Sequence, residues 1–175
     1  MHYPLLTSRL RIRPIDETDL DAFVAYRSVA EVARFQSWGT TYAFEQALEL
    51  ARSQVGVVFP ASGDWLQLGI HLLDSDELIG DVALHNVAGA TKVIELGFTL
   101  APEHQGRGYG LEAVKGVITA VRDGNSATKF VAHTDARNTP SIKLLQVVGL
   151  EEHPELSWIE EFKGETVKVL RFESP

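Results

Sequence analysis

Three glycines spaced two residues apart stand between a strand-like segment and a helix-like segment near the middle of the chain. Residues Glu95 to Leu100 alternate in polarity, Gln105-Gly106-Arg107-Gly108-Tyr109-Gly110 follows, and apolar residues recur at helical spacing from Leu111 onwards. Glycine lets the backbone approach a ligand closely, and a helix N-terminus adds unpaired N–H groups and a positive dipole end. The stretch therefore predicts a site for an anion such as phosphate. A plain turn from strand to helix is the alternative that the local pattern leaves open.

Two familiar glycine motifs fit this stretch poorly. A dinucleotide-binding fold places its first glycine directly after the strand with the spacing G-x-G-x-x-G, whereas Ala101 to Gln105 intervene here and the spacing is G-x-G-x-G. A P-loop needs a Lys-Ser/Thr pair after its last glycine, where this chain has Leu111-Glu112. The P-loop is excluded, and the dinucleotide-binding interpretation is weakened.

Composition limits the chemistry that the chain can perform. Its 175 residues are 45% hydrophobic, which suits a single domain over 1–175 with one sizeable core. Cysteine is absent, so disulfides, thiolate metal ligands and a cysteine nucleophile are excluded. The net charge of −8 opposes general affinity for nucleic acid, and it suits solubility or cationic substrates.

The N-terminal residues Met1 to Thr7 lack a basic segment followed by a long apolar one, and no apolar run approaches the ~20 residues of a membrane span. We therefore expect a cytoplasmic protein without a membrane partner.

The first half of the chain predicts a strand, two helices and then three strands. Alternation indicates a strand over 10–15, and apolar spacing indicates helices from Asp16 to about Val32 and from Tyr42 to about Gln54, the second capped by Thr41. Arg27 and Arg34 are interpreted as solvated. We expect the loop 35–40 to form either a wall of a substrate pocket or a small apolar cluster beside the main core. Strands over 65–73, 77–86 and 92–100 with short turns predict an antiparallel meander.

The second half adds a parallel crossover. A helix behind the glycines ends near Asp123-Gly124-Asn125, and a strand over 129–134 follows. Thr139 is the predicted cap of a short helix that Gly149 ends, and segments 156–162 and 166–173 predict a hairpin. The fold class is therefore α+β, with a mixed, mostly antiparallel sheet of about seven strands flanked by about four helices.

Several motifs in order resemble one family. The pattern Gln105-x-x-Gly108-x-Gly110 is followed by Asn138-x-x-Ser141, and the chain is similar to the GNAT superfamily of acyl-CoA-dependent N-acetyltransferases, within it the ribosomal-protein-alanine (RimJ/RimL-like) branch. The resemblance covers most of the chain. It rests on Thr7-Ser8-Arg9-Leu10-Arg11-Ile12-Arg13-Pro14, Leu78-Ile79-Gly80, Glu95-Leu96-Gly97-Phe98, the glycine hexapeptide, Arg137-Asn138-Thr139-Pro140-Ser141-Ile142-Lys143-Leu144-Leu145 and Val148-Gly149-Leu150.

The resemblance implies acetyl-CoA as co-substrate and no metal. Its pyrophosphate would lie on the amides of Gln105, Gly106, Arg107, Gly108, Tyr109 and Gly110, with Arg107 as a flexible cation. The pantetheine arm would pair like an extra strand with the strand that carries Phe98 and Leu100, where this strand diverges from 129–134. Asn138 resembles the family residue that hydrogen-bonds this arm. A turn asparagine before a helix is the alternative for Asn138.

Acetyl transfer to an amine needs a proton acceptor, an oxyanion donor and a proton for the thiolate. Glu95, expected among largely apolar neighbours, is the first candidate for general base and His85 the second, whereas His71 and His133 are interpreted as ordinary strand residues. A structural salt bridge is the alternative role of Glu95. The family's tyrosine near the last helix is missing, so Ser141 is the candidate partner of the thiolate, and an N–H of the bulged central strand would hold the oxyanion.

The sequence thus predicts an acetyl-CoA-dependent N-acetyltransferase that transfers the acetyl group directly, in a ternary complex, to a primary amine. The acceptor is a protein or peptide N-terminus or a small amine, and a homodimer is left open. A non-catalytic acyl-CoA-binding module is the first alternative, and a nucleotide-dependent enzyme is the second.

Overall fold

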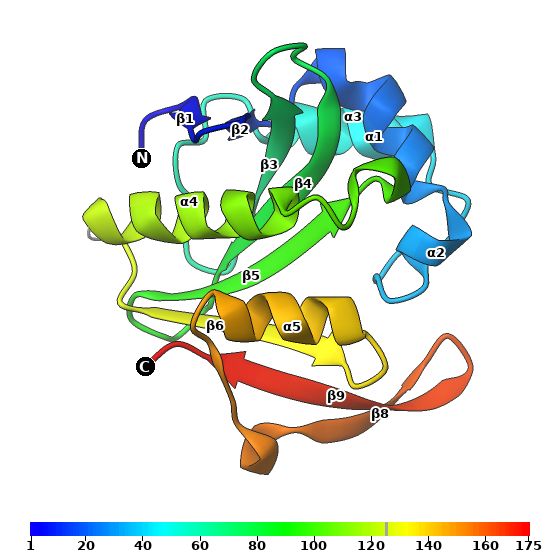
Figure 1. The fold of residues 1–175 in the computed structure, drawn as a ribbon, viewed down its shortest axis with the longest axis vertical. Coiled ribbons are helices and arrows are strands. Elements are labelled where there is room, and N and C mark those ends of the chain that lie inside the picture. The colour runs from blue at the N-terminus through cyan, green and yellow to red at the C-terminus, as the bar shows by residue number, and fades with distance from the viewer. Residues whose placement is uncertain (125) are drawn as a thin grey trace.

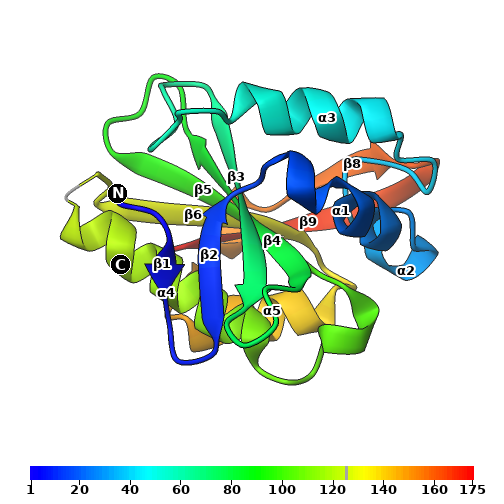
Figure 2. The same cartoon turned by 90° about the horizontal axis from the view of Figure 1, so that it is seen from above.

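The computed structural model describes residues 1–124 and 126–175, and these residues form one nine-stranded sheet with helices on both faces (Figures 1 and 2). The sheet order is β1-β2-β3-β4-β5-β6-β9-β7, and β8 pairs with β9. The strands are β1 (Leu5–Leu6), β2 (Leu10–Pro14), β3 (Trp65–Leu72), β4 (Leu78–Asn86), β5 (Val93–Leu100), β6 (Lys129–Asp135), β7 (Glu151–Glu152), β8 (Trp158–Phe162) and β9 (Glu165–Glu173).

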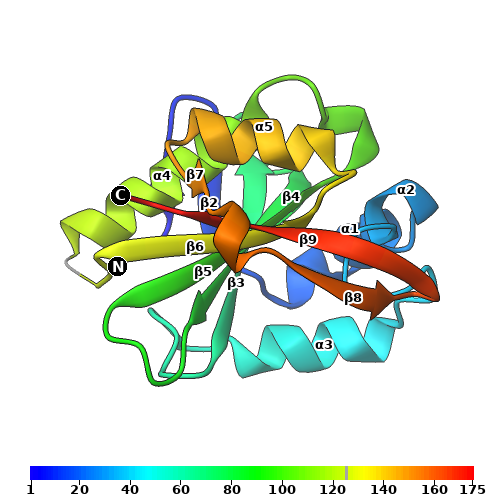
Figure 3. The same cartoon turned by 90° about the horizontal axis from the view of Figure 1, so that it is seen from below.

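The helices lie in two layers, with α4 and α5 on one face of the sheet and α1, α2 and α3 on the other (Figure 3). Their bounds are α1 (Leu20–Arg27), α2 (Ala30–Ala33), α3 (Phe44–Ser53), α4 (Tyr109–Asp123) and α5 (Thr139–Val147), with short 3-10 turns η1 (Glu17–Asp19), η2 (Pro102–His104) and η3 (Pro154–Leu156). No helix among the described residues is long and apolar enough to cross a membrane.

The predicted α+β architecture is confirmed. β3, β4 and β5 form the expected antiparallel meander, and α4 makes the expected parallel crossover from β5 to β6. The sheet has more than the predicted seven strands because two-residue strands β1 and β7 pair at its ends, too short to give an alternating pattern. Asn125, part of the predicted end of α4, lies outside the described residues.

β5 and β6 stay together for only three residue pairs. Val93, Ile94 and Glu95 face Lys129, Phe130 and Val131, and beyond Glu95 the strands separate. The predicted divergence of these two strands is confirmed. On the other side of β5 the pairing with β4 continues from Ile94 to Leu100, so only the edge of β5 that faces β6 loses its partner.

The main core lies between this sheet and α4. Ile94 and Leu96 of β5 are buried, and they cluster with the apolar stripe of α4, which includes Val114 and Val117. This burial explains the alternation of β5: its even-numbered residues face the core, and its odd-numbered residues lie on the opposite face. Each fully buried aliphatic side chain of this kind contributes about 1.5–3 kcal/mol.

The first predicted helix is wrong in its continuity. It divides into η1, α1 and α2 because Val29 has an extended backbone, with φ −72° and ψ 129°. The carbonyl of Arg27, which the end of α1 leaves free, accepts a hydrogen bond from Trp38 Nε1 at 3.1 Å. The break therefore turns the chain towards the loop that carries Trp38.

Two predicted helix caps are also wrong. The second helix begins at Phe44 with Ala43 as its N-cap, in place of Thr41, and the Gln46 side chain accepts the Ala43 N–H at 3.0 Å. At α5, Asn138 takes the cap position predicted for Thr139, and its Oδ1 accepts the Ser141 N–H at 3.3 Å. In both places the side chain that closes the first turn reaches across three residues, which is normal for a cap.

Arg27 is buried, and the prediction that it is solvated is wrong. Its guanidinium lies 3.9 Å from the ring centroids of both Phe23 and Trp38, and it pairs with Asp81 of β4 at 3.4 Å. Cation–π contacts on two faces and a buried carboxylate compensate for the loss of water around this charge. The ion pair fixes α1 and the following loop to the sheet.

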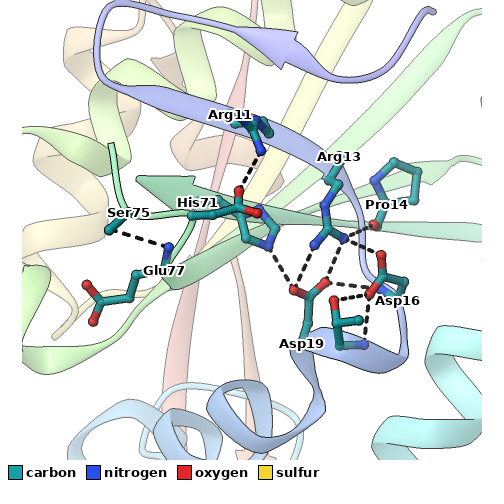
Figure 4. Close-up of polar contacts among 10 residues, drawn as sticks. Arg11, Arg13, Pro14, Asp16, Asp19, His71, Ser75 and Glu77 are labelled. Atoms are coloured by element: carbon teal, nitrogen blue, oxygen red, sulfur yellow. Dashed lines mark hydrogen bonds and ion pairs between the residues drawn. The ribbon is translucent and has the colours of Figure 1, made fainter. Parts of the chain in front are cut away.

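A second buried ionic group closes the junction between β2, β3 and η1 (Figure 4). Asp19 accepts hydrogen bonds from His71 Nε2 at 2.8 Å and from Arg13 Nη1 at 2.9 Å, and also from the Asp16 N–H. Burial raises the pKa of Asp19, but these hydrogen bonds outweigh it, so the pKa lies below its usual value. His71 lies in the predicted strand, and there its ring is a partner in this buried group.

Asp19→Ala is expected to lower the free energy of unfolding by about 3 kcal/mol, because it leaves the half-buried Arg13 and the buried His71 without their carboxylate. Since the folded pKa of Asp19 is depressed, its contribution is present above the unfolded pKa and is lost as the pH falls through the folded one. Urea unfolding at pH 7 and in acid measures both effects. Asp21→Ala, an exposed carboxylate on α1, is the control; an equal loss in both variants would contradict the assignment.

Candidate active site

A cavity of about 650 Å³ occupies the separation between β5 and β6. One wall is β5 from Leu96 to Leu100, and the other is β6 from Ala132 to Thr134. The glycine loop and the first turns of α5 close it on one face of the sheet, and the α2 segment, with Glu31 and Phe35, closes it on the other. The cavity thus passes from one helical layer to the other through the sheet.

The glycine loop has a backbone that other residues adopt only under strain. Gly106 and Gly108 have φ values of +72° and +80°, and Gly108 is the N-cap of α4. A Cβ on Gly110 would lie 3.1 Å from Leu144 and 3.3 Å from Leu100, so this glycine lets β5, α4 and α5 meet at the cavity. The loop therefore directs the free N–H groups of the first turn of α4 to the cavity mouth.

The N-terminal segment holds this loop in place. Glu112 of α4 accepts hydrogen bonds from Thr7 Oγ1 at 2.6 Å and from Arg9 Nε at 2.7 Å. Arg9 also donates to the Arg107 carbonyl at 3.1 Å, and its guanidinium lies 4.4 Å from the Tyr109 ring centroid. The Thr7–Pro14 motif thus fixes the start of α4 from behind.

Most of the predicted cofactor residues line the cavity, and two do not. Those at the cavity wall are Phe98, Leu100, Gln105, Gly106, Gly108, Gly110, Asn138 and Ser141. Arg107 is exposed beside the loop, and Tyr109 packs beneath Arg9. The Gln105 side chain caps the end of β5, because its Nε2 donates to the Leu100 carbonyl at 3.0 Å.

A polar row crosses the opposite face of the sheet at the inner end of the separation. Glu95 Oε2 lies 3.0 Å from His85 Nδ1, and Glu95 Oε1 lies 2.9 Å from His133 Nδ1. The hydrogen bond from His133 is the largest cause that holds the pKa of Glu95 below its usual value; burial opposes it, and the His85 hydrogen bond adds to it. The expectation of largely apolar neighbours around Glu95 is therefore wrong.

Cross-strand registry explains this row. His85 is directly opposite Glu95, and His133 lies two residues beyond Val131, which pairs with Glu95 from the other side. Arg171 of β9 is opposite His133, and its Nη1 lies 3.1 Å from His133 Nε2. Aromatic rings bound the row at both ends: Trp65 stacks on His85 at 4.5 Å, and Trp158 meets His133 edge-on at 5.0 Å.

His133 and Arg171 were not expected at this site. His133 is the member of the row that lines the cavity, and it is no ordinary strand residue. The alternation along β6 shows in the sequence on which face of the strand His133 lies. Which residues lie beside His133 on that face depends on the register of β6 with β5. Glu95 and His85 lie behind it, and Leu96, next to Glu95, reaches the cavity wall.

The expected bulge in the central strand is absent. The register of β4 with β5 runs without a shift from Gly80–Leu100 to Asn86–Ile94, and the irregularity lies between β3 and β4 at Ile70/His71. An oxyanion donor from β5 would therefore come from its free edge beyond Glu95. No group of three or more His, Cys, Asp or Glu side chains in the described ranges could hold a metal ion.

The α2 side of the cavity is tied to the β8–β9 hairpin. Lys163, at the hairpin turn, donates to the carbonyls of Ala33 at 2.6 Å and Trp38 at 2.5 Å. Partial burial lowers the pKa of this lysine. Phe35 lines the cavity whereas Trp38 packs on Arg27, so the loop 35–40 serves as pocket wall and as core at once.

The sheet separation and the glycine loop at its mouth agree with the family that the sequence motifs resemble. The family model described as "Acetyltransferase (GNAT) domain" matches residues 9–151, and the chain belongs to this family.

Named relatives agree with this assignment. The chain is 27% identical to the uncharacterized N-acetyltransferase p20 of Bacillus licheniformis, over 96% of this chain and 93% of that protein. Its fold is similar to RimL, a ribosomal L7/L12 alpha-N-protein acetyltransferase solved with coenzyme A (TM-score 0.80, 14% identity, 98% and 97% of the two chains). It is equally similar to spermidine N-acetyltransferase from Vibrio cholerae, solved with CoA and spermine (TM-score 0.80, 20% identity, 95% of each chain).

Lys163→Met is expected to loosen the α2 side of the cavity, because two backbone carbonyls lose a charged donor. Amide hydrogen exchange should become at least about tenfold faster for residues 30–38 and 159–166, while the sheet core stays protected. Mass spectrometry of exchanged peptides measures this. Lys168→Met, an exposed lysine of the same hairpin, is the control, and unchanged exchange in Lys163→Met would show that the tie carries no local stability.

Proposed function

We propose that this protein is an acetyl-CoA-dependent N-acetyltransferase that transfers the acetyl group directly to a primary amine within a ternary complex. The observation that carries the proposal is the cavity through the sheet, which joins a phosphate-type loop on one face to a histidine–carboxylate row on the other. Two substrates can enter such a cavity from opposite faces and meet at its middle, so no covalent intermediate on a side chain is needed.

The residues at the cavity fit coenzyme A. The free N–H groups of the first turn of α4 suit a pyrophosphate, and exposed Arg107 adds a mobile cation beside the loop. The free edge of β5 beyond Glu95 can pair with an extended pantetheine arm. The side-chain oxygen Oδ1 of Asn138 caps α5. The side-chain N–H₂ of Asn138 is therefore left to hydrogen-bond the pantetheine arm. Acetyl-CoA supplies an activated thioester carbonyl.

Two roles in the transfer belong to side chains of this chain. Ser141, in the first turn of α5, lines the cavity and can hydrogen-bond the leaving thiolate. The row of His85, Glu95 and His133 stands at the opposite side, where the amine must lose a proton before it attacks.

The acceptor class is the finer part of the proposal. The ordered motifs of the chain favour the RimJ/RimL-like branch, and therefore a protein or peptide N-terminus. A small amine is the other acceptor that the cavity suits, because acidic Glu31 lines its α2 side and the chain carries a net charge of −8.

A thiol-release assay with acetyl-CoA and a panel of N-terminal peptides, polyamines and other primary amines tests the function. Release above the hydrolysis background with at least one amine is expected. Ser141→Ala should lower kcat about tenfold without a change in CoA affinity, since it removes one hydrogen bond to the leaving group. CoA binding without release for any amine would contradict catalysis and would favour an acyl-CoA-binding module. Tighter binding of NAD or ATP than of CoA would contradict the CoA site itself.

Gly108→Ala is expected to weaken CoA binding at least about tenfold, because a side chain at φ +80° costs about 1–2 kcal/mol and the loop must shift to relieve it. Isothermal titration with CoA measures the change. Gly89→Ala is the matched control, since Gly89 has φ +74° and lies in open space away from the cavity. Equal affinity in the wild type and Gly108→Ala would contradict a pyrophosphate site on this loop.

A further inference from the structure

The hydrogen bonds of the polar row fix where its protons lie. A carboxylate only accepts, so His85 and His133 must each carry a proton on the Nδ1 that faces Glu95. A guanidinium only donates, so His133 Nε2 must use its lone pair towards Arg171. Both rings are therefore Nδ1–H tautomers, and His133 is neutral.

Of the two histidine rings, His85 is the one whose second nitrogen is left without a partner among the described residues. Both oxygens of Glu95 accept an N–H, and these hydrogen bonds stabilise the carboxylate and disfavour its protonation. A proton on His133 Nε2 would face Arg171. On His85 Nε2, no hydrogen bond to another described residue occupies the lone pair.

We infer that His85, and not Glu95, accepts the proton of the incoming amine, and that Glu95 is a positioning residue that orients His85 and stabilises its protonated form. The inference rests on the proposed function. It reverses the order of candidates that the sequence suggests, because the hydrogen bonds around Glu95 come from the tertiary register and not from its own segment.

One proton of the ammonium substrate moves to His85 Nε2 by way of water, because His85 does not itself line the cavity, and the neutral amine then bonds to the thioester carbonyl carbon. The C–S bond breaks, the second proton lost by the nitrogen ends on the CoA sulfur, and His85 releases its proton to solvent. The imidazolium formed on His85 makes an ion pair with Glu95, whose Oε2 lies 3.0 Å from His85 Nδ1, as in other carboxylate–histidine pairs.

The charges around the row favour this assignment. Glu95 faces His85 from β5, and behind it stand His133 and Lys129 on β6 and Arg171 and Glu173 on β9. Glu173 pairs with both Lys129 and Arg171, so it partly neutralises the cations nearest to His133. From β3, His85 meets the uncharged Trp65, which stacks on the ring face and leaves the ring edge free. A proton on His85 thus meets a carboxylate, and the contacts of the described residues place no cation against this ring.

Nitrogen-15 NMR of the histidine rings tests the proton positions without any substrate. The protein has six histidines, and His85→Gln and His133→Gln assign the two signals. Nδ1–H tautomers are expected for both rings. An Nε2–H tautomer of His85 would overturn the inference.

The pH dependence of kcat/KM tests the catalytic role. The wild type should lose activity on the acid side, because a proton acceptor that is already protonated cannot take the proton of the amine. His85→Gln should lower kcat/KM about 100-fold and remove the acid limb, that is, the fall in kcat/KM towards low pH. A variant that only disturbs the structure would lower kcat/KM without changing its pH dependence. His133→Gln and Glu95→Gln should keep an acid limb at reduced rates.

His153→Gln is the matched control, because His153 makes a similar 2.9 Å contact with Glu155 at the surface, and its rate and pH profile should be unchanged. Loss of the acid limb in Glu95→Gln with its retention in His85→Gln would identify Glu95 as the base and overturn the inference. A wild type that binds CoA but acetylates no amine at any pH refutes the proposed function and the catalytic role together, while the NMR result still decides whether His85 has its free lone pair on Nε2.

Discussion

Beyond Glu95, the edges of β5 and β6 that face each other carry backbone N–H and C=O groups for which the described residues offer no β-pairing partner. Such groups are costly when they are buried and unsatisfied, so this part of the sheet must stay open to solvent or receive a ligand with matching groups. The rest of the architecture preserves the opening. Leu100, Gly110 and Leu144 bring β5, α4 and α5 together at its mouth.

The polar row on the opposite face follows from the same separation. Because β5 and β6 are still paired at Glu95, the last residues before the opening share one register, and that register brings His85 and His133 to the two oxygens of one carboxylate. Glu95 is depressed in pKa by these donors, mainly by His133. The network therefore favours the ionised form of Glu95.

The sequence could predict those parts of the fold that depend on local pattern. The alternation of β3, β4 and β5 and the apolar stripe of α4 gave the meander and the parallel crossover, since each pattern is set by the burial of one face. Helix caps were less predictable, because Thr139 and Asn138 are both good cap residues and only the turn geometry selects Asn138. The glycine loop was found because it combines special backbone conformation with a helix start.

The histidine row and the burial of Arg27 could not be predicted, for a different reason. Nothing near His133 in the sequence distinguishes it from a strand residue at a solvent face; its partners come from β5 and β9 and meet it only through the sheet register. Arg27 stands at the end of a helix, where a solvated arginine is usual. Its carboxylate partner, Asp81, lies on β4, far along the chain.

The walls on the acceptor side are attached to the sheet by a few specific contacts and not by continuous pairing. Arg27 holds the loop after α1 by stacking and an ion pair, and Lys163 ties the β8–β9 turn to two backbone carbonyls of that same segment. Because Lys163 donates to two main-chain oxygens, the side chains of the residues between them can change without loss of these hydrogen bonds. The fold itself is shared, at 14–20% identity, with proteins named for acceptors as different as a ribosomal protein and spermidine. Under the proposed function, the segments tied by Arg27 and Lys163, and not the sheet, would therefore select the acceptor.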